Sequence, residues 1–385
     1  MTAPIYIQNR YQSAYSLLGA MADQLATALR SAGHDVREPD PSDPPSRGTF
    51  LFFNVPPSID TFPPALLERD SDLRAVQIFV DHPFALPAVV LDDWHARNGL
   101  ENLRLCLPCA DDTHLLRLRF PGLNHEWLRH AIPRDALCDA DELTAPRWAS
   151  RTHDAVVAGS IASEAEVSRC LSDLPPKSST IVRAIADTML RDPRLGFVQA
   201  LDLCASDHAL TTGDWATAAS LWRAAIMLVN RARRVGVVRA LQGIDVAVFG
   251  PDAWRAECTG TIRYLGNADY AQVNRSFADA RVAIAWGPTQ FAHSYSERLM
   301  LAMGAGCAPI SDDRLLVRRD FNDACAIYNA ANPASARAAC DHLLNNPGAA
   351  LELAARARAS AEQNCLWEQR IAQLIEPAKA PPVPT

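Results

Sequence analysis

Short apolar runs alternate with helical patterns along most of this 385-residue chain, and that alternation limits what the chain can fold into. In residues 14–32, for example, Met21, Leu25 and Leu29 fall on one face of a helix. Strands that alternate with helices pair in parallel and are covered on both faces. The predicted strands are 4–9, 35–36, 49–55, 75–80, 103–107, 155–158, 245–249, 262–265, 283–286 and 307–310, and the predicted later helices include 64–68, 112–120, 334–344, 349–363 and 366–375. The sequence therefore predicts an α/β fold with mostly parallel sheets.

The length is enough for two domains that each bury a core of their own. The stretch 131–151 holds Pro133, Pro146 and several acidic residues, which is typical of an interdomain linker. We expect a Rossmann-like N-terminal domain, a linker, a Rossmann-like C-terminal domain with a helical insert, and a final helix with a frayed tail. Their expected bounds are 1–135, 136–150, 151–365 with the insert at about 175–235, and 366–385. Two such halves are expected to face each other across a cleft, where the carboxyl ends of the strands bind ligands.

The composition favours a soluble globular protein, with 49% apolar and 21% charged residues. The net charge of -7 argues against a general partner of nucleic acid or of anionic membranes. No apolar run approaches the roughly 20 residues of a membrane span. The first residues, MTAPIYIQNR, lack the charged-then-apolar layout of a signal peptide, so we expect a cytoplasmic protein.

Ten cysteines are scattered along the chain, and Cys106-Leu-Pro-Cys109 is the one C-x-x-C pair. A redox or zinc site needs a helix start, a second pair or nearby His ligands, and the local pattern is that of a strand. We expect both to be reduced cysteines of the core.

The segment from Ser294 to Ser311 reads as a short helix followed by a buried strand. The hydroxyls of Ser294 and Ser296 suit a helix N-cap, and Gly304 and Gly306 suit the opposite end. A helix start offers free N–H groups and the positive end of its dipole, and Arg298 stands in the first turn. This combination fits a phosphate or diphosphate. The alternative is an ordinary helix-turn-strand connection with a surface ion pair.

Several segments, in this order and spacing, resemble the GT-B glycosyltransferases, most closely the bacterial CgeB-like, spore maturation protein-like group. The resemblance covers most of the chain apart from the helical insert, and its pieces are 80–87, 111–122, 128–133, 244–254, 262–286 and 296–313. It implies a transferase whose nucleotide-sugar donor is a co-substrate, held chiefly by the C-terminal domain, and whose acceptor is a glycan, a protein or a small molecule. A GT-B-like subunit that binds nucleotide sugars or serves as a scaffold without catalysis is the alternative.

The resemblance also implies roles for individual residues. The positions near the donor base are Tyr264, Leu265 and Gly266, those near the diphosphate and sugar are Ser294, Tyr295, Ser296, Glu297 and Arg298, and Gly159 and Ser160 match the loop that approaches the phosphates. One position departs from the pattern. Many retaining members carry a Glu three residues after the motif Arg, where it holds the donor ribose, and this chain has Leu301. Ribose binding must then differ, and the stereochemistry stays open.

Glycosyl transfer needs neutralisation of the leaving diphosphate, and Arg298 is the first candidate for that role. The acidic pairs Asp139/Asp141 and Asp312/Asp313 do not follow convincing strands, so we expect no metal and no cofactor. The first loop also lacks the Gly-x-Gly-x-x-Gly of a dinucleotide dehydrogenase.

An inverting mechanism needs a general base, which is expected on the N-terminal side, near the acceptor. His82 follows a strand beside Asp81, which either orients the imidazole ring or takes the proton itself. The alternative is a structural Asp-His-Pro turn, in which both side chains bond backbone groups around Pro83.

Overall fold

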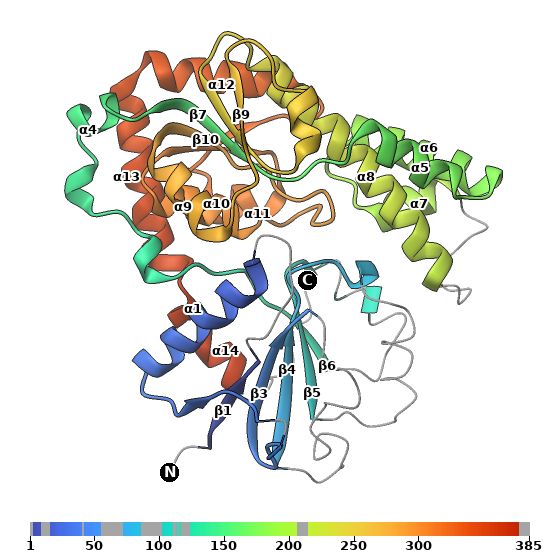
Figure 1. The fold of residues 1–385 in the computed structure, drawn as a ribbon, viewed down its shortest axis with the longest axis vertical. Helices are drawn as coiled ribbons and strands as arrows, with labels where there is room; N and C mark the ends of the chain where they lie inside the picture. The colour runs from blue at the N-terminus through green and yellow to red at the C-terminus, as the bar shows by residue number, and fades with distance from the viewer. Residues whose placement is uncertain are drawn as a thin grey trace. The chain divides into compact units, whose positions relative to one another are not determined.

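The computed structural model describes residues 3–8, 16–40, 42–54, 72–85, 102–110, 113, 115–116, 124–205 and 215–376. The chain divides into two compact units, and each is built on a parallel sheet of its own (Figure 1). The first domain combines Met1–Pro133 with Leu366–Thr385, and the second is Arg134–Cys365. The two parallel sheets confirm the predicted α/β class with two Rossmann-like domains.

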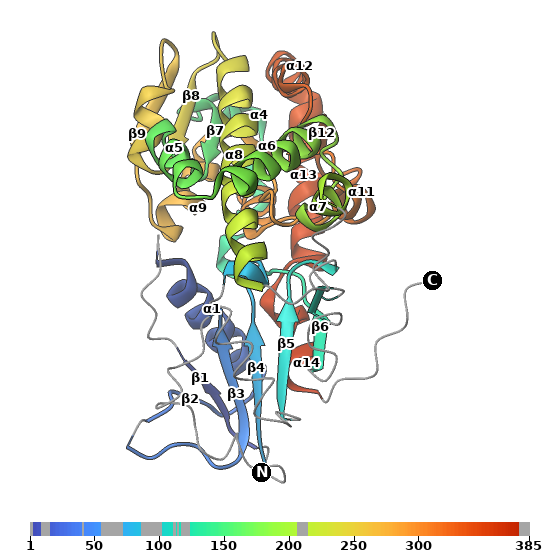
Figure 2. The same cartoon turned by 90° about the vertical axis from the view of Figure 1, so that its right-hand side faces the viewer.

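The first domain contains a six-stranded sheet in the order β2-β1-β3-β4-β5-β6, in which every neighbouring pair is parallel. Figure 2 shows β3 to β6 side by side. Its strands are β1 (Ile5–Ile7), β2 (Val36–Arg37), β3 (Gly48–Phe53), β4 (Leu73–Ile78), β5 (Leu103–Leu107) and β6 (Asn124–Trp127). β5 is buried at every position, including Arg104, as expected of a strand that is covered on both faces.

One face of this sheet is covered by α1 (Leu17–Ser31) and by the end of the chain, η10 (Trp367–Gln369) and α14 (Ile371–Ile375). Buried residues of α1 such as Leu25 share a core with Phe53 of β3 and with Trp367. The Trp367 indole also donates to Gln24 Oε1 at 3.3 Å. The predicted last helix is therefore part of the first domain, because its apolar residues complete that core.

The second domain contains a six-stranded parallel sheet in the order β12-β11-β10-β7-β8-β9. Its strands are β7 (His153–Ala158), β8 (Val246–Phe249), β9 (Ile262–Gly266), β10 (Ala280–Ile284), β11 (Ala308–Asp312) and β12 (Ala326–Tyr328). From β7 the chain first adds strands on one side, β8 and β9, and then returns to the other side with β10. The strand order reverses between β7 and β10.

Helices of the second domain pack on this sheet and fill its core. They are α9 (Tyr270–Ala278), α10 (Glu297–Gly304), α11 (Leu315–Phe321), α12 (Pro333–Asn345) and α13 (Pro347–Asn364). Ala336 of α12 and Leu353 of α13 join Val157, Ile284 and Ile310 of three neighbouring strands in one buried cluster. The Ala-rich patterns of α12 and α13 thus serve close packing.

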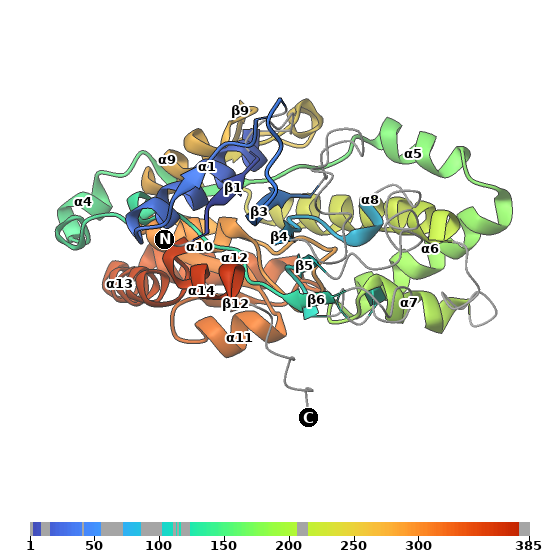
Figure 3. The same ribbon diagram turned by 90° about the horizontal axis from the view of Figure 1, so that it is seen from below.

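The helical insert consists of α5 (Glu164–Ser172), α6 (Pro176–Arg191), α7 (Phe197–Cys204) and α8 (Trp215–Ala240). These four helices lie together and extend to one side of their own domain's sheet (Figures 1 and 3). The C-terminal part of α8 returns to the sheet, where Val235 and Val238 join the core. The described helices of this region run from Glu164 to Cys204 and from Trp215 to Ala240, and the insert was predicted at about 175–235.

The expected linker 136–150 groups with the second domain. It holds η6 (Ala140–Glu142) and α4 (Ala145–Ala149), after η5 (Arg134–Ala136). Trp148 is 3% exposed in the core, and Arg281 donates to the Ala149 carbonyl at 2.8 Å. The helix expected at 64–68 and most of that at 112–120 lie outside the described residues.

Cys106 and Cys109 are buried and not disulfide-bonded. Burial, with the nearby Glu126 carboxylate, raises the pKa of the Cys106 thiol well above its ordinary value. The prediction of reduced core cysteines is confirmed. Among the helices of the described ranges, none combines the length and apolar character of a membrane span.

Candidate functional site

The reversal of strand order in the second domain brings two loops together at the carboxyl edge of its sheet. β7 and β10 pair in parallel, with Val157 opposite Ile284. The loop after β7 begins with Gly159 and Ser160, and the loop after β10 contains Trp286 and Gly287. Open parallel sheets bind ligands in the crevice at such a reversal. The candidate site is built from this point outwards.

Gly159 lies at the centre of the site. Its N–H donates to the Phe249 carbonyl at 3.0 Å, and its own carbonyl accepts the indole N–H of Trp254 at 2.6 Å. A Cβ at position 159 would lie 3.1 Å from Trp286 Nε1 and 3.3 Å from Arg298 Nη1. A glycine therefore lets two nitrogen donors approach the backbone closely, from the β10 loop and from α10.

The indole ring of Trp286 is held from two sides. Its ring stacks on that of Trp254, with centroids 6.3 Å apart and planes 23° apart. The guanidinium carbon of Arg234 lies 5.7 Å from the centroid of Trp286. Arg234 is fixed in turn, because its Nη1 donates to the Ser160 carbonyl. Trp286 is only 4% exposed, and its Nε1 meets no hydrogen-bond acceptor within the described part of the chain.

The helix α10 begins at the same place. Ser296 is the N-cap residue, with extended backbone (φ -106°, ψ 173°), and its hydroxyl makes no capping bond. Arg298 pairs through Nε with Glu297 Oε1 at 3.4 Å, and a quarter of its side chain is exposed. Arg298 Nη1 and Ser296 Oγ are buried without a partner among the described residues. The first turn of a helix also has free N–H groups and a positive partial charge.

Arg314 fixes the segment that leads into α10. It is 4% exposed and pairs through Nε with Asp312 Oδ2 at 2.7 Å. Its other nitrogens donate to the carbonyls of Gly287 (2.8 Å), Pro288 (2.9 Å), Phe291 and Ser294 (3.3 Å). Asp312 Oδ1 accepts the Gly287 N–H at 2.7 Å. One buried ion pair thus holds both ends of the 287–294 loop.

Positive charge is in excess around this site. Burial, followed by the charges of Arg298 and Arg314, lowers the pKa of the Arg234 guanidinium to about 9. Burial and the charge of Arg314 lower the pKa of Arg233 to about 10. The opposing carboxylates are Asp312, Glu297 and Asp192. Guanidinium groups that repel each other in a buried place favour an anionic ligand, which relieves the repulsion.

The structure brings together five of the positions that the sequence nominated for the donor, namely Gly159, Ser160, Ser296, Glu297 and Arg298. The alternative of a surface ion pair between Glu297 and Arg298 holds in part. The pair exists at 3.4 Å, but Glu297 is buried and Arg298 also faces Gly159.

Two nominated residues have other contacts. Tyr295 is buried against Phe321, with centroids 4.7 Å apart, and its hydroxyl donates to Asp320 Oδ2 at 3.0 Å. Its side chain therefore packs towards α11. Ser294 is 2% exposed and its carbonyl accepts from Arg314. Leu301, at the position of the usual ribose Glu, is fully buried in α10.

Tyr264, Leu265 and Gly266 lie at the end of β9, the edge strand of the sheet. The Tyr264 hydroxyl donates to the Gly250 carbonyl at 3.1 Å and to Asp252 Oδ1 at 2.9 Å. Gly266 has φ +97°, and its carbonyl accepts the Gly250 N–H at 3.0 Å. Leu265 is 44% exposed, which leaves an apolar surface at this loop.

Asp81 and His82 follow β4 in the first domain. Asn54, in a left-handed conformation (φ +47°), donates to Asp81 Oδ2 at 2.9 Å and accepts the Val80 N–H at 2.6 Å. His82 is 4% exposed, and its Nδ1 accepts the Phe84 N–H at 3.1 Å. A neutral imidazole with Nδ1 as acceptor carries its proton on Nε2. The Nδ1 atom of His82 is thus engaged by a backbone N–H, whereas the Asp81 residue is exposed.

Sequence reasoning missed Trp254, Trp286, Arg234 and Arg314. Trp286 ended a predicted strand and read as a core residue, although β10 ends at Ile284. Arg234 lies within a long helix, where an Arg is ordinarily at the surface. One signal was available, because a Trp-Gly pair directly follows a strand at Trp286.

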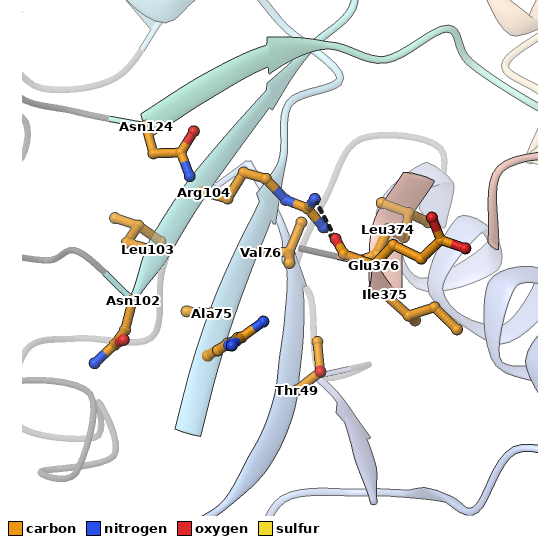
Figure 4. A pocket seen from close by; sticks show the side chains of 11 residues that line it. Thr49, Ala75, Val76, Asn102, Leu103, Arg104, Asn124, Leu374, Ile375 and Glu376 are labelled. Carbon is orange, nitrogen blue, oxygen red and sulfur yellow. Dashed lines mark hydrogen bonds between the residues drawn. The ribbon is translucent and has the colours of Figure 1, made fainter. Parts of the chain in front are cut away.

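Two cavities accompany these domains. One of about 900 Å³ in the second domain borders Ile161, Asp252 and α8, and its buried Glu257 is paired with Arg231 and with Arg239 (2.8 Å). The other, of about 360 Å³ in the first domain, is lined by Thr49, Arg74, Asn102 and Asn124 (Figure 4). It lies where β3 to β6 begin, and Arg104 there donates to the Glu376 carbonyl at 2.9 Å. This second cavity is at the opposite strand ends from Asp81.

Solved structures with the same architecture span the whole chain. Sucrose-phosphate synthase from Thermosynechococcus elongatus superimposes with a TM-score of 0.53 at 11% identity, covering 97% of each chain. T4 phage BGT in complex with its UDP-glucose substrate superimposes with a TM-score of 0.53 at 11% identity, covering 98% of this chain and 100% of that one. A glycosyltransferase from Rickettsia africae gives 0.51 at 8% identity, over 98% and 100%. The fold is GT-B.

Part of the chain also matches a protein family in sequence. Residues 231–376 match the family model described as glycosyl transferase-like. That range includes Arg234, Trp254, Trp286, Arg298 and Arg314, and so most of the site described above. A comparison with curated proteins finds no match.

Proposed function

We propose that this protein is a glycosyltransferase of the CgeB-like group that takes a hexose from a nucleotide-sugar donor. The observation that carries the proposal is the convergence of Arg298, the start of α10 and the side-chain-free backbone of Gly159 at the reversal of strand order. Guanidinium nitrogens, helix N–H groups and a close glycine suit a diphosphate. The glycosyl transferase-like match over 231–376 supports this reading.

In the proposed reaction the bond between the sugar and the diphosphate breaks, and the acceptor oxygen forms the new bond to the sugar. The leaving diphosphate gains negative charge, which Arg298 and the helix start neutralise without a metal. Asp81 is the proposed general base that takes the acceptor proton, and Asn54 orients it. The acceptor is a glycan, a protein or a small molecule, and we place the reaction in the cytoplasm.

The experiment is a titration of the purified protein with UDP, GDP and dTDP by calorimetry and thermal shift. A ligand that binds only the folded protein raises its melting temperature. Arg298→Ala is expected to weaken binding about 10- to 100-fold, since a bond to a charged group contributes roughly 1.5–3 kcal/mol. The matched control is Arg194→Ala, because Arg194 is 78% exposed on the insert and pairs with Asp192.

Transfer is tested with the donor whose diphosphate binds, as hydrolysis and as transfer to a panel of acceptors. Asp81→Asn is expected to abolish turnover and to keep nucleotide binding. Binding of a diphosphate together with no turnover for any donor would favour the non-catalytic alternative, to which the buried Leu301 points. If none of the three nucleotides binds the wild-type protein, the proposal is wrong.

A further inference from the structure

The indole of Trp286 is a polar donor without an acceptor in a buried place. The residue is 4% exposed, and Nε1 has no hydrogen-bond partner in the described part of the chain. A buried N–H without a partner costs free energy, so such groups are rare unless a ligand completes them. Trp254, which stacks on Trp286, differs from it because its indole N–H donates to the Gly159 carbonyl at 2.6 Å.

The position of this N–H matches a ligand that lies on Gly159. Both Trp286 Nε1 and Arg298 Nη1 border the place where a side chain at Gly159 would be, at 3.1 Å and 3.3 Å from its Cβ. Ser296 Oγ, at the start of the same helix as Arg298, is a further buried hydroxyl without a described partner. Trp286 Nε1 and Arg298 Nη1 come from different elements and border one small volume beside Gly159.

The ring cannot easily turn away from that volume. Trp254 stacks on one side of Trp286, and Arg234, anchored to the Ser160 carbonyl, lies over the ring at 5.7 Å. Reorienting the indole in a packed core requires its neighbours to move. Trp286 is therefore preorganised, and its N–H is fixed before a ligand arrives.

We infer that Trp286 is a specificity-determining residue of the donor site, whose indole N–H donates to a phosphate oxygen of the nucleoside diphosphate alongside Arg298. This inference rests on the proposed function and adds a neutral donor to its cationic partner. Arg234 is a positioning residue, since it acts on the ligand through the orientation of Trp286. The indole N–H can only donate a hydrogen bond. It therefore favours a ligand with an acceptor, such as a phosphate oxygen, at this position and disfavours a ligand with a donor there.

The test replaces Trp286 by Phe and, in a second variant, by benzothienylalanine, which keeps the shape of the ring and lacks the N–H. Binding of UDP and of inorganic pyrophosphate is measured by calorimetry at one salt concentration. Both variants are expected to bind each ligand about 10-fold more weakly than wild type. Trp148→Phe is the control for loss of ring volume, because Trp148 is 3% exposed in the core of the same domain.

A second readout reports the hydrogen bond itself. The chain has 8 Trp residues, so a spectrum of its ¹⁵N-labelled indole groups contains few signals, and the Phe variant assigns that of Trp286. Pyrophosphate is expected to move this signal downfield. Equal binding by wild type and the benzothienylalanine variant, with no such movement, overturns the inference and leaves the proposed function standing. Wild-type protein that binds neither pyrophosphate nor any nucleoside diphosphate overturns both.

Discussion

Gly250 and Trp254 touch so closely that position 250 has no room for a side chain. A Cβ there would lie 2.7 Å from Trp254 Cδ1 and 2.3 Å from the Gly159 carbonyl oxygen. The loop after β8 therefore presses the Trp254 indole against the loop after β7, where it bonds Gly159. The backbone that surrounds the candidate site is set by this contact between loops of neighbouring strands.

Gly250→Ala is expected to destabilise the second domain by about 3 kcal/mol, because the Gly159 carbonyl and the Trp254 indole are packed and would have to move. Urea unfolding measures this cost. Gly348→Ala is the control, since its Cβ would meet nothing within 4 Å in α13, and Ala favours a helix by roughly 1 kcal/mol. A Gly250→Ala protein as stable as wild type contradicts the described packing.

Gly159→Ala should behave differently. Its Cβ would meet the far end of Arg298 and the edge of Trp286 at 3.3 Å and 3.1 Å, so the fold adjusts at a cost of about 1 kcal/mol. The methyl group then narrows the space between Gly159, Trp286 and Arg298 in which the proposed phosphate oxygen lies. Nucleotide affinity is expected to fall at least about 10-fold, roughly 1.4 kcal/mol, in calorimetry. Unchanged affinity in a stable variant would place the phosphate elsewhere.

The Asp312–Arg314 pair predicts how stability depends on pH. Burial alone would raise the pKa of Asp312, but the charge and hydrogen bonds of Arg314 and the Gly287 N–H outweigh it, so that pKa is lowered. A lowered pKa means that the ionised group stabilises the fold fully above its unfolded value of roughly 4. The contribution is lost as pH falls below that value towards the folded pKa.

Asp312→Asn removes this contribution and leaves Arg314 buried without its carboxylate, so a loss of about 3 kcal/mol at pH 7 is expected. The difference from wild type should shrink as the pH falls below about 4. Urea titrations across this range measure both. Asp313→Asn is the neighbouring control, because the side chain of Asp313 is 40% exposed and its ion pair with Arg318 lies at the surface. A gap between Asp312→Asn and wild type that stays constant with pH excludes this role of Asp312.

Arg104 is predicted to hold the last helix on the first domain. Its guanidinium group donates to the Leu374 and Glu376 carbonyls. Its Nη1 also pairs with Glu126 Oε1 at 3.3 Å. Arg104→Met should cost about 2 kcal/mol and speed hydrogen exchange of the α14 amides. Arg74→Met, an exposed change on the neighbouring strand, should have little effect. Exchange that rises equally in both domains would instead indicate global unfolding.

Much of the fold was predictable, because strand and helix periods are local properties of the sequence. The place of Arg298 in the first turn of a helix was also predictable, since a Ser followed by a helical pattern indicates an N-cap from the local sequence alone. Trp286 was not, because an apolar residue at the end of a strand ordinarily belongs to the core. Its place beside Gly159 depends on β10 returning next to β7, a relationship across more than a hundred residues.

Buried arginines were missed for a similar reason. Arg234 follows Arg231 and Arg233 in α8, and the spacing suggests a charged surface. Its burial arises because the helix returns to the sheet at that turn. The membership of α14 in the first domain likewise depends on a partner core far away in sequence, which no local pattern reveals.

The first domain is discontinuous, and this has a consequence for how the chain acquires its structure on the ribosome. Residues up to Pro133 emerge first, yet Trp367, Ile371 and Leu374 are needed to cover their sheet. The second domain, Arg134–Cys365, is complete in sequence before that covering segment is translated. The domain that is begun first is therefore the last to be completed.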